Sequence, residues 1–309
     1  QRVYIVDSRQ IDELTALLAV AHEGSFVQAG RRLHRHATII SKRIASLEAR
    51  LGVRLVERTT RQIRLTDAGR RLADKTESAV DSLHNAELEA SDSAEDLRGK
   101  LRLAFPATMG RLWLAPILPE FLKMYPALKV EVLYSEQYVD LVGEGFDAAI
   151  RIGVLQDSRL KARKLWHQKR VLGASPEYVA KHGLPSEPED LIHHNCLGFP
   201  ALATFPEWQL SNGDRVESII TRSSLLSNDS LALLEAARQG VGILGAGDWL
   251  MAKDFAQGSL VPVLPNWSFD ASGGIYLVRP SSNFAPARTE AFIEWIVGRF
   301  QNGPPWISC

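Results

Sequence analysis

The sequence has only two cysteines, Cys196 and Cys309, among its 309 residues. Two cysteines this far apart supply neither a disulfide framework nor a zinc-binding spacing. No apolar run approaches the roughly 20 residues that cross a bilayer, and no signal-peptide pattern opens the chain. We therefore expect a cytoplasmic protein without disulfide bonds, a bound metal or a membrane segment.

Motifs of catalysis are missing as well. The chain has no nucleophile elbow, no HExxH pair and no phosphate-binding loop. The run 240–245 fits G-x-G-x-x-G, but a predicted helix precedes it and a predicted strand follows, the reverse of a dinucleotide site. His193 and His194 are adjacent, so their side chains point apart, and no third metal ligand is close in sequence. These absences predict a protein that is not an enzyme and that needs no cofactor.

The charged residues are unevenly distributed, although Lys+Arg and Asp+Glu are equal at 36 each. Residues 1–65 hold 12 basic and 6 acidic residues, residues 66–100 hold 5 and 9, and residues 101–309 hold 19 and 21. A basic head on an acidic remainder indicates that only the head meets a polyanion.

A helix-turn-helix is predicted at residues 24–51. Ser25, with Gln28 three residues later, is a capping-box pattern, so a short helix should run from about 26 to 33. A second helix follows a basic break and is stopped by Gly52.

On a helical wheel the second helix has two distinct faces. One stripe is apolar and should be buried: Ile40, Ile44, Leu47 and Leu51. The opposite face is small, polar and cationic: Thr38, Ser41, Lys42, Ala45 and Ala49. Small outward side chains let a helix enter the DNA major groove, which is about 12 Å wide. This is therefore the predicted recognition helix, although a small helical bundle with a solvated face has the same pattern.

The flanking segments complete the same domain. An earlier set at helical spacing predicts a third helix of its core: Ile11, Leu14, Leu17, Leu18 and Ala21. After Gly52, the runs 55–58 and 62–65 predict a β-hairpin wing that carries several arginines. Those arginines either contact phosphates or only protect a solvated strand edge. Beside a recognition helix we favour phosphate contact.

A long helix is predicted after Thr66, which should cap it, and it should run to about Ala94. Its small and apolar residues follow a heptad pattern: Leu72, Thr76, Ala79, Leu83, Ala86 and Ala90. Such a seam favours pairing with a second copy of the chain. A solvated linker helix is the alternative.

From Gly99 onward, predicted strands and helices alternate, which favours mostly parallel sheets with helices on both faces. Strands are expected at 100–105, 130–133, 148–152, 169–174 and 275–278. Helices are expected at 111–124, 138–144, 229–239 and 285–300. The tail after Gln301 should be loose.

Five stretches of the chain match one known family in order and spacing. The N-terminal ones are GSFVQAGRRL at 24–33 and SKRIASLEARLGVRLVERTTRQIRLTDAG at 41–69. The others are LAPILPEFLKMYPALKVEV at 114–132, DLVGEGFDAAIRIG at 140–153 and GVGIL at 240–244, the last followed by a Trp-Leu helix. On these stretches the chain resembles the LysR-type transcriptional regulators over nearly its whole length.

The resemblance implies an α/β protein with an N-terminal winged helix-turn-helix. Three parts are implied: the DNA-binding domain at 1–65, a dimerising linker helix at 66–98 and an effector-sensing domain at 99–309. The last part should consist of two α/β subdomains, like a periplasmic binding protein: subdomain I at about 99–168 and 275–301, and subdomain II at about 169–274. Such proteins are homotetramers, dimers of dimers, that bind double-stranded promoter DNA. A small effector in the cleft changes transcription, and RNA polymerase is a partner of those that activate.

Residues for DNA contact follow from the match. We predict base-edge contacts from Thr38, Ser41 and Lys42, and phosphate contacts from Arg31, Arg43, Arg58 and Arg61. The family often opens the recognition helix with Ser, Gln and Pro or Ser, where this chain has His36, Ala37 and Thr38. Ala37 cannot make the bidentate contact of Gln to adenine, so the operator's inner bases should differ.

The effector cleft is predicted where the strands of both subdomains end. The match places these effector-binding residues there: Ala107, Thr108, Ser135, Gln137, Ile152, Gly153, Phe199, Asn228 and Asp229. Thr108 precedes a helix whose free N–H groups suit an anion, whereas Asn228 and Asp229 are slightly better explained as helix caps. The run 244–247, Leu-Gly-Ala-Gly, replaces the family's Ala-Leu-Leu-Pro and should open one wall of the pocket, which predicts a larger effector or none.

A second function remains open at this point. A small-molecule-binding protein or enzyme of the binding-protein fold would use the basic head for assembly only. It would bind its ligand equally well after Lys42→Ala or Arg58→Ala, whereas a regulator would lose DNA binding.

Overall fold

The computed structural model describes residues 7–58, 63–91, 97–155, 160–200, 205–269, 273–281 and 285–307. The chain forms two compact units, the first built mainly from residues 1–93 and the second from the residues that follow. No helix in the described ranges is long and apolar enough to cross a bilayer.

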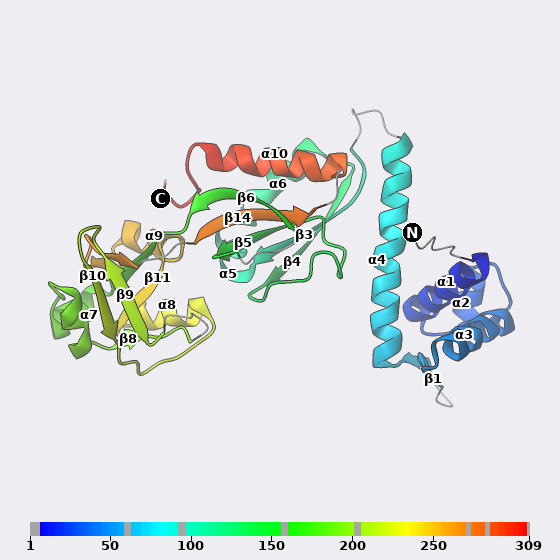
Figure 1. Cartoon of the computed structure of the whole chain (residues 1–309), viewed down its shortest axis with the longest axis horizontal. Coiled ribbons are helices and arrows are strands. Elements are labelled where there is room, and N and C mark those ends of the chain that lie inside the picture. Colours follow the sequence, from blue (N-terminus) through cyan, green and yellow to red (C-terminus); the bar gives the residue numbers. More distant parts are fainter. Residues whose placement is uncertain are drawn as a thin grey trace. The chain divides into compact units, whose positions relative to one another are not determined.

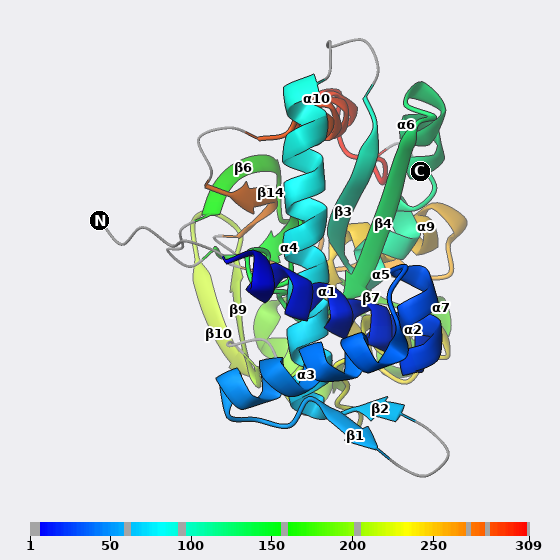
Figure 2. The same cartoon turned by 90° about the vertical axis from the view of Figure 1, so that its right-hand side faces the viewer.

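The first unit is a winged helix-turn-helix with one long helix attached (Figure 2). Its elements are α1 (Ser8–Glu23), α2 (Phe26–Arg32), α3 (Ala37–Leu51), β1 (Val56–Arg58), β2 (Ile63–Leu65) and α4 (Asp67–Ser91). The predicted start of α2 is confirmed, because Ser25 Oγ accepts the Val27 N–H at 3.3 Å. Gly52, at φ 67°, ends α3 as expected, and Thr66 Oγ1 accepts the Gly69 N–H at 3.0 Å at the start of α4. Strands β1 and β2 pair antiparallel, so the wing is confirmed too.

The core of this unit lies among α1, α2, α3 and the start of α4. Ile40, Ile44 and Leu47 are fully buried in it, together with Leu17 of α1. Two predicted core residues are not buried: Ile11 is 53% exposed and Leu51 is 44% exposed. Both belong to the end turns of their helices, where no neighbouring element covers the apolar face.

The predicted seam of α4 lies in two different environments. Leu72 packs against the helix-turn-helix core and Thr76 is buried, so the first half of the seam is covered within the same chain. Further along, Ala79, Val80 and Leu83 are exposed. The side chains of Ala86 and Ala90 lie outside the described residues. The first two seam residues therefore need no second copy of the chain to be covered.

The second unit contains three sheets (Figure 1). The largest has the order β4-β3-β5-β14-β6: β4 (Leu128–Ser135), β3 (Gly99–Pro106), β5 (Ala148–Gly153), β14 (Gly274–Pro280) and β6 (Leu160–His167). Strand β3 is parallel to β4 and β5, whereas β14 is antiparallel to β5 and β6. This sheet forms subdomain I.

The other two sheets form subdomain II. One is β12 (Val261–Val263), β7 (Arg170–Ala174), β11 (Ile243–Gly247) and β8 (Cys196–Leu197). The other is β10 (Val216–Ile220), β9 (Glu207–Ser211) and β13 (Ser268–Phe269). Of the named strands here, only β8 and β11 pair in parallel, so the expectation of a mostly parallel sheet is wrong for subdomain II. The two α/β subdomains themselves are as expected.

Helices pack around these sheets. In subdomain I they are α5 (Ala107–Met109), the π-helical turn η1 (Gly110–Leu114), α6 (Leu118–Met124) and α10 (Ala287–Gln301). In subdomain II they are α7 (Pro176–His182), the 3₁₀ helix η2 (Pro188–His193), α8 (Ser230–Arg238) and α9 (Asp248–Gln257). The helix expected at 138–144 is absent: residues 141–145 form turns. Gly143 and Gly145 lower helix propensity there, and Gly145 has φ 69°.

The tail after α10 is not loose where the structure describes it. Trp306 is 4% exposed and packs in the main core of the second unit. Its ring lies 5.9 Å from the Trp113 ring and 5.9 Å from the Phe300 ring, measured between centroids. Burial of one large aromatic side chain outweighs the flexibility that the preceding glycine and prolines indicate.

Candidate functional site

The turn of the helix-turn-helix depends on one close backbone approach. A Cβ on Gly30 would lie 2.6 Å from the Arg35 carbonyl oxygen, so only glycine fits there. The Arg35 N–H donates to the Gly30 carbonyl at 2.8 Å, and His34 has a positive φ of 52°. This turn brings α3 across α2 with its N-terminus exposed.

The cap of α3 is a histidine, which the sequence patterns did not identify. His36 Nδ1 accepts the Thr38 N–H at 3.4 Å and lies 2.9 Å from Thr38 Oγ1. The imidazole ring thus takes the place of the Ser, Thr, Asp or Asn side chain that usually caps the N-terminus of a helix. It also holds the Thr38 hydroxyl at the start of the outward face.

The outward face of α3 has the predicted composition. Thr38, Lys42, Ala45 and Ala49 are exposed, and Ser41 is half-buried beside them. Lys42 forms no ion pair or hydrogen bond within the described residues, so its ammonium is available to an external partner. The face is therefore small, polar and cationic, as a helix in the major groove requires.

Two carboxylates of α1 hold α3 in place. Glu13 is buried, and its carboxylate accepts the Ser46 hydroxyl at 2.5 Å and Arg50 Nε at 3.0 Å. Asp12 pairs with Arg43. Arg43, predicted to contact phosphate, thus carries an internal partner. Sequence patterns missed Glu13, because a lone acid in an amphipathic helix normally marks a solvated face.

Glu13 makes the stability of this unit depend on pH. Burial alone raises its pKa, but the hydrogen bonds from Ser46 and Arg50 outweigh burial and leave the pKa below its ordinary 4.5. A lowered folded-state pKa contributes stability above pH 4.5, and this contribution is lost as pH falls through the lower value.

We expect Glu13→Gln to lower the unfolding free energy by about 1–3 kcal/mol at pH 7, and the difference to shrink in acid. Urea unfolding of the full chain followed by circular dichroism tests this, with the exposed Glu57→Gln as control. An equal loss at every pH would contradict it.

Glu48 connects the recognition helix to the wing. Its Oε1 accepts the Leu55 N–H at 2.7 Å and the Val56 N–H at 3.0 Å. Both of these residues are buried, so the two N–H groups have no ready access to water. The carboxylate therefore fixes where β1 begins relative to α3.

We expect Glu48→Ala to destabilise the wing by about 2–3 kcal/mol, because two buried N–H groups lose a charged acceptor. Glu48→Gln keeps an acceptor oxygen and should cost less than about 1 kcal/mol. Amide hydrogen exchange at Leu55 and Val56 measures this directly. Unchanged protection of both amides in the alanine variant would show that the wing is held by other contacts.

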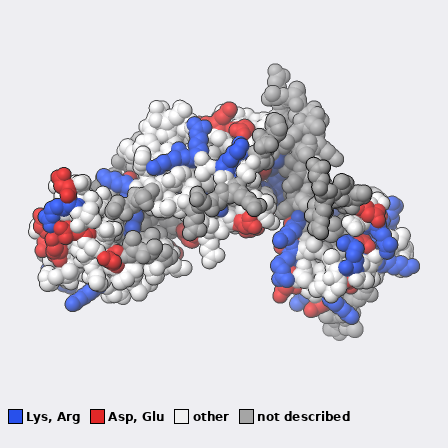
Figure 3. All heavy atoms as spheres, in the orientation of Figure 1, with Lys and Arg blue, Asp and Glu red and all other residues white. Residues whose placement is uncertain are grey.

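The cations around α3 differ in their availability. Arg31 is exposed on α2 and forms no ion pair among the described residues, whereas Arg32 pairs with Glu23 at 2.9 Å. Arg61 and the Arg58 side chain lie outside the described residues. On the visible face of this unit Lys and Arg side chains are prominent (Figure 3).

In the second unit, the predicted anion position at Thr108 is already occupied by a side chain. Thr108 is buried, and its N–H and Oγ1 donate to Glu136 Oε1 at 3.0 and 2.8 Å. The free donors expected beside Ala107 therefore point at a carboxylate of this chain. Sequence reasoning missed Glu136, which lies at the end of the neighbouring strand.

The other predicted residues of subdomain I lie on adjacent strand ends. Ser135 Oγ accepts the Gln137 N–H at 3.0 Å in a tight turn. The Tyr138 hydroxyl then donates to the Ile152 carbonyl at 2.7 Å, and it lies 3.6 Å from where a Cβ on Gly153 would stand. Tyr138, which the sequence analysis did not single out, thus joins the two loops.

The predicted residues of subdomain II have different roles. Asp229 caps α8, accepting the Leu231 and Ala232 N–H groups at 2.8 and 3.3 Å, so the capping explanation is confirmed. Asn228 is exposed, and Phe199 is half-buried. Phe199 lines a cavity of about 100 Å³ on this subdomain, between β7, β11 and the starts of α8 and α9.

The glycines of β11 do not simply open that cavity. A Cβ on Gly245 would meet the Phe269 ring at 2.5 Å, and one on Gly247 would meet Trp249 Nε1 at 2.2 Å. Aromatic rings of the same subdomain have taken the space that larger side chains would fill. The predicted widening of the pocket is therefore mostly wrong, and only the small cavity remains.

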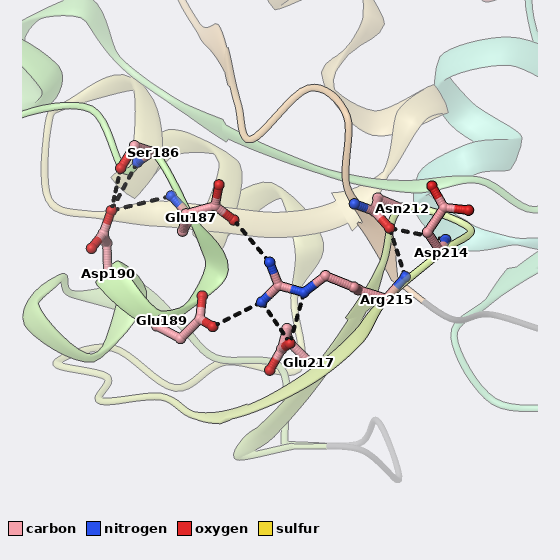
Figure 4. A network of polar contacts seen from close by, with 8 residues as sticks. All are labelled: Ser186, Glu187, Glu189, Asp190, Asn212, Asp214, Arg215 and Glu217. Carbon is pink, nitrogen blue, oxygen red and sulfur yellow. Dashed lines mark hydrogen bonds and ion pairs between the residues drawn. The ribbon is translucent and has the colours of Figure 1, made fainter.

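On the surface of subdomain II, acidic side chains gather around one arginine (Figure 4). Arg215 on the β9–β10 hairpin pairs with Glu217 at 2.8 Å and with Glu189 at 3.3 Å. Asp190 caps the start of η2 by accepting the Ser186 N–H at 2.9 Å. The ion pairs of Arg215 join the β9–β10 hairpin to η2.

Metal and thiol chemistry find no support in the described part of the chain. No group of three potential metal ligands occurs in these ranges. Of the two adjacent histidines, His193 is exposed. His194 is buried, and its Nδ1 lies 3.2 Å from the Tyr178 hydroxyl oxygen. Cys196 is fully buried, and burial raises the pKa of its thiol to about 12, so it remains protonated and unreactive.

Comparisons with known proteins agree with this architecture. Residues 11–70 match the bacterial regulatory helix-turn-helix protein, lysR family, and residues 94–301 match the LysR substrate binding domain. The HTH-type transcriptional regulator PtxR of Pseudomonas aeruginosa is 34% identical over 92% of this chain and 91% of its own length.

Solved full-length structures are similar as well. CrgA, a LysR-type transcriptional regulator from Neisseria meningitidis, has 30% identity and a TM-score of 0.61, with 96% of this chain and 100% of that chain covered. The Vibrio cholerae virulence activator AphB has 28% identity and a TM-score of 0.61, covering 93% and 98%. The chain therefore belongs to the LysR family of DNA-binding transcriptional regulators, with a helix-turn-helix domain and an effector-binding domain.

Proposed function

We propose that the chain acts on promoter DNA by placing α3 in the major groove, and that a small effector in the second unit alters this binding. The observation that carries the proposal is the outward face of α3, which is exposed, small and cationic. Base-edge contacts are assigned to Thr38, Ser41 and Lys42. Membership of a regulator family speaks against a binding protein or enzyme that uses its head for assembly only.

Phosphate contacts are assigned to the cations that flank this face. Arg31 is exposed and has no internal ion pair in the described ranges, so it neutralises a phosphate at little cost. Arg43 exchanges Asp12 for a phosphate. Arg58 and Arg61, which the sequence assigns to the wing, complete the set. Contacts of this type fix the orientation of the protein on DNA, and base-edge contacts specify the sequence.

The proposed assembly is a dimer of dimers. The predicted linker segment, residues 66–98, contains α4, which ends at Ser91. This helix pairs with a second copy through its exposed apolar part, which includes Val80 and Leu83. The sensing domain, residues 99–309, follows it. Two helix-turn-helix domains in one dimer then bind two half-sites of promoter DNA. If the protein activates, RNA polymerase is a further partner.

The effector position is proposed at the strand ends of the two subdomains. The predicted residues are Ala107, Thr108, Ser135, Gln137, Ile152, Gly153, Phe199, Asn228 and Asp229. Because Glu136 bonds both donors of Thr108, an anionic effector at this position has to displace the Glu136 carboxylate. Asp229, which caps α8, is the weakest member of the set.

A gel-shift experiment tests the proposal. The full chain is mixed with a DNA fragment from upstream of its own or a neighbouring gene, between about 50 and 200 mM salt. We expect retardation that weakens steeply with salt, because each phosphate contact adds about 0.9 to the negative slope of log K against log salt. A folded protein that retards no DNA at low salt would overturn the proposal.

A further inference from the structure

Arg170 is a buried cation without a carboxylate partner. It lies at the start of β7 and is 7% exposed. Its polar contact is a long bond from Nη2 to the Gly245 carbonyl at 3.4 Å, and its guanidinium stands 4.0 Å from the centre of the Phe269 ring. No ion pair to Arg170 occurs among the described residues. Most of its five N–H donors therefore lack an acceptor.

A buried, unpaired charge is costly unless something compensates it. Burial lowers the pKa of Arg170 to about 10, so the guanidinium still carries its charge at neutral pH. One carbonyl and one aromatic ring compensate it only in part. This arrangement differs from Arg238 on α8, whose Nε and Nη2 contact the Asp254 carboxylate at 2.6 and 2.9 Å.

The guanidinium is not sealed inside the core, because Arg170 lines the cavity of about 100 Å³ described above. Trp249 also lines the cavity with its indole ring, but its Nε1 is itself buried and has no hydrogen-bond partner. Nε1 lies 2.2 Å from the position of a Cβ on Gly247, which is itself a cavity wall. Ser230, the first residue of α8, is a further polar residue of the cavity wall.

The rest of the wall is apolar, with Phe199, Leu233, Leu244 and Leu250. Donors on one side and apolar groups on the other suit a ligand that has an anionic head and an apolar body. The cavity is smaller than the roughly 300–1,000 Å³ of typical ligand pockets, so the ligand is small. A planar guanidinium binds a carboxylate through two parallel bonds.

We propose that this cavity is a binding site for a small monocarboxylate with an apolar body, whose carboxylate pairs with the Arg170 guanidinium. The proposal deepens the proposed function, since it gives the effector a chemical class and a position in subdomain II. It is separate from the Thr108 position, where Glu136 already satisfies the donors.

Calorimetric titration and thermal shift of the full chain with acetate, butyrate and benzoate test the proposal. Butyramide and benzamide are the neutral controls. We expect butyrate or benzoate to bind and to raise Tm, acetate to bind more weakly, and the amides to have no effect. Inorganic phosphate has no apolar body and should bind less well. Equal protection by phosphate or by the amides would overturn the assignment to a carboxylate.

Three variants locate the site. Arg170→Met keeps the bulk and should weaken carboxylate binding by about 10–100-fold, the usual range for hydrogen bonds to a charged group. Arg170→Lys keeps a cation but loses the planar pair of donors that binds a carboxylate, and should weaken binding by about tenfold. Arg215→Met removes an arginine of the surface network in Figure 4 and should change nothing.

Arg170→Lys keeps the buried charge, so the proposal remains testable even if Arg170→Met folds poorly. Unchanged affinity in both Arg170→Met and Arg170→Lys would overturn the proposal, as would a parent protein that binds none of the carboxylates. Gel shifts on the same samples separate the two ideas. DNA retention without carboxylate binding refutes only this inference, whereas carboxylate binding without DNA retention refutes only the proposed function.

Discussion

Lys42→Glu is expected to lose specific DNA binding, with Kd for the operator rising at least about 100-fold. A base contact is worth about 1–3 kcal/mol, and reversal of the charge adds repulsion from the neighbouring phosphates. The lysine is exposed on the outward face of α3 and has no internal partner in the described ranges. Its loss should therefore leave the fold intact, and Tm should not change.

Fluorescence anisotropy with a labelled operator measures this effect, and the salt slope is recorded for each variant. Lys75→Glu is the matched control, because it makes the same change of charge on the exposed surface of α4. We expect the control to keep the operator affinity within a few-fold. Parent-like affinity and salt slope in Lys42→Glu would show that α3 does not read DNA through this face.

Leu83→Asp is expected to break the pairing of α4, to lower the mass of the assembly and to weaken binding to a two-half-site operator by about 10²–10⁴-fold. The side chain is 68% exposed on α4, so in a single chain it gains nothing from burial. In a paired helix it becomes a seam residue, and a carboxylate there is desolvated without a partner. The lost affinity is the avidity of two linked DNA-binding domains.

Light scattering coupled to size exclusion gives the mass of the variant at micromolar concentration. Ile220→Asp is the control: it places the same change on an equally exposed apolar residue, 73% exposed on β10. A dimer or tetramer of unchanged mass in Leu83→Asp, with parent-like affinity, would move the assembly interface away from this part of α4.

The parts of the fold that depend on local chemistry were predictable from the sequence. Ser25, Gly52 and Thr66 mark helix ends through bonds to residues two to four positions away. The wing and the main strands follow from apolar alternation in the same way. Helix caps and apolar alternation involve residues that are close in sequence, so one sequence is enough to recognise them.

What the sequence did not reveal depends on contacts between distant residues. Glu13 and Ser46 are 33 positions apart, and Thr108 and Glu136 are 28 apart. In each case a carboxylate looks like an ordinary surface residue until the fold gives it a partner. The buried Trp306 is a similar case, because its neighbour Trp113 belongs to the opposite end of the domain's sequence.

The candidate site likewise has one part that was predictable from local sequence and one part that depends on distant contacts. The exposed face of α3 was predictable because helical periodicity alone decides which side chains share it. Arg170 was not, because charge and burial coincide there only through β11 and Phe269. The family resemblance also predicts effector-binding residues at the ends of strands, whereas Arg170 lies at the start of β7.

The bond from Glu48 to the first residues of the wing has a consequence for how such a protein chooses its targets. Since α3 and β1 share this carboxylate, they shift together, and the head has little freedom to reshape itself on a poor sequence. Two such heads bind together only where the separation and relative rotation of the half-sites match those of the heads. We expect insertion of about five base pairs between half-sites, half a helical turn of DNA, to be tolerated less well than a single mismatched base.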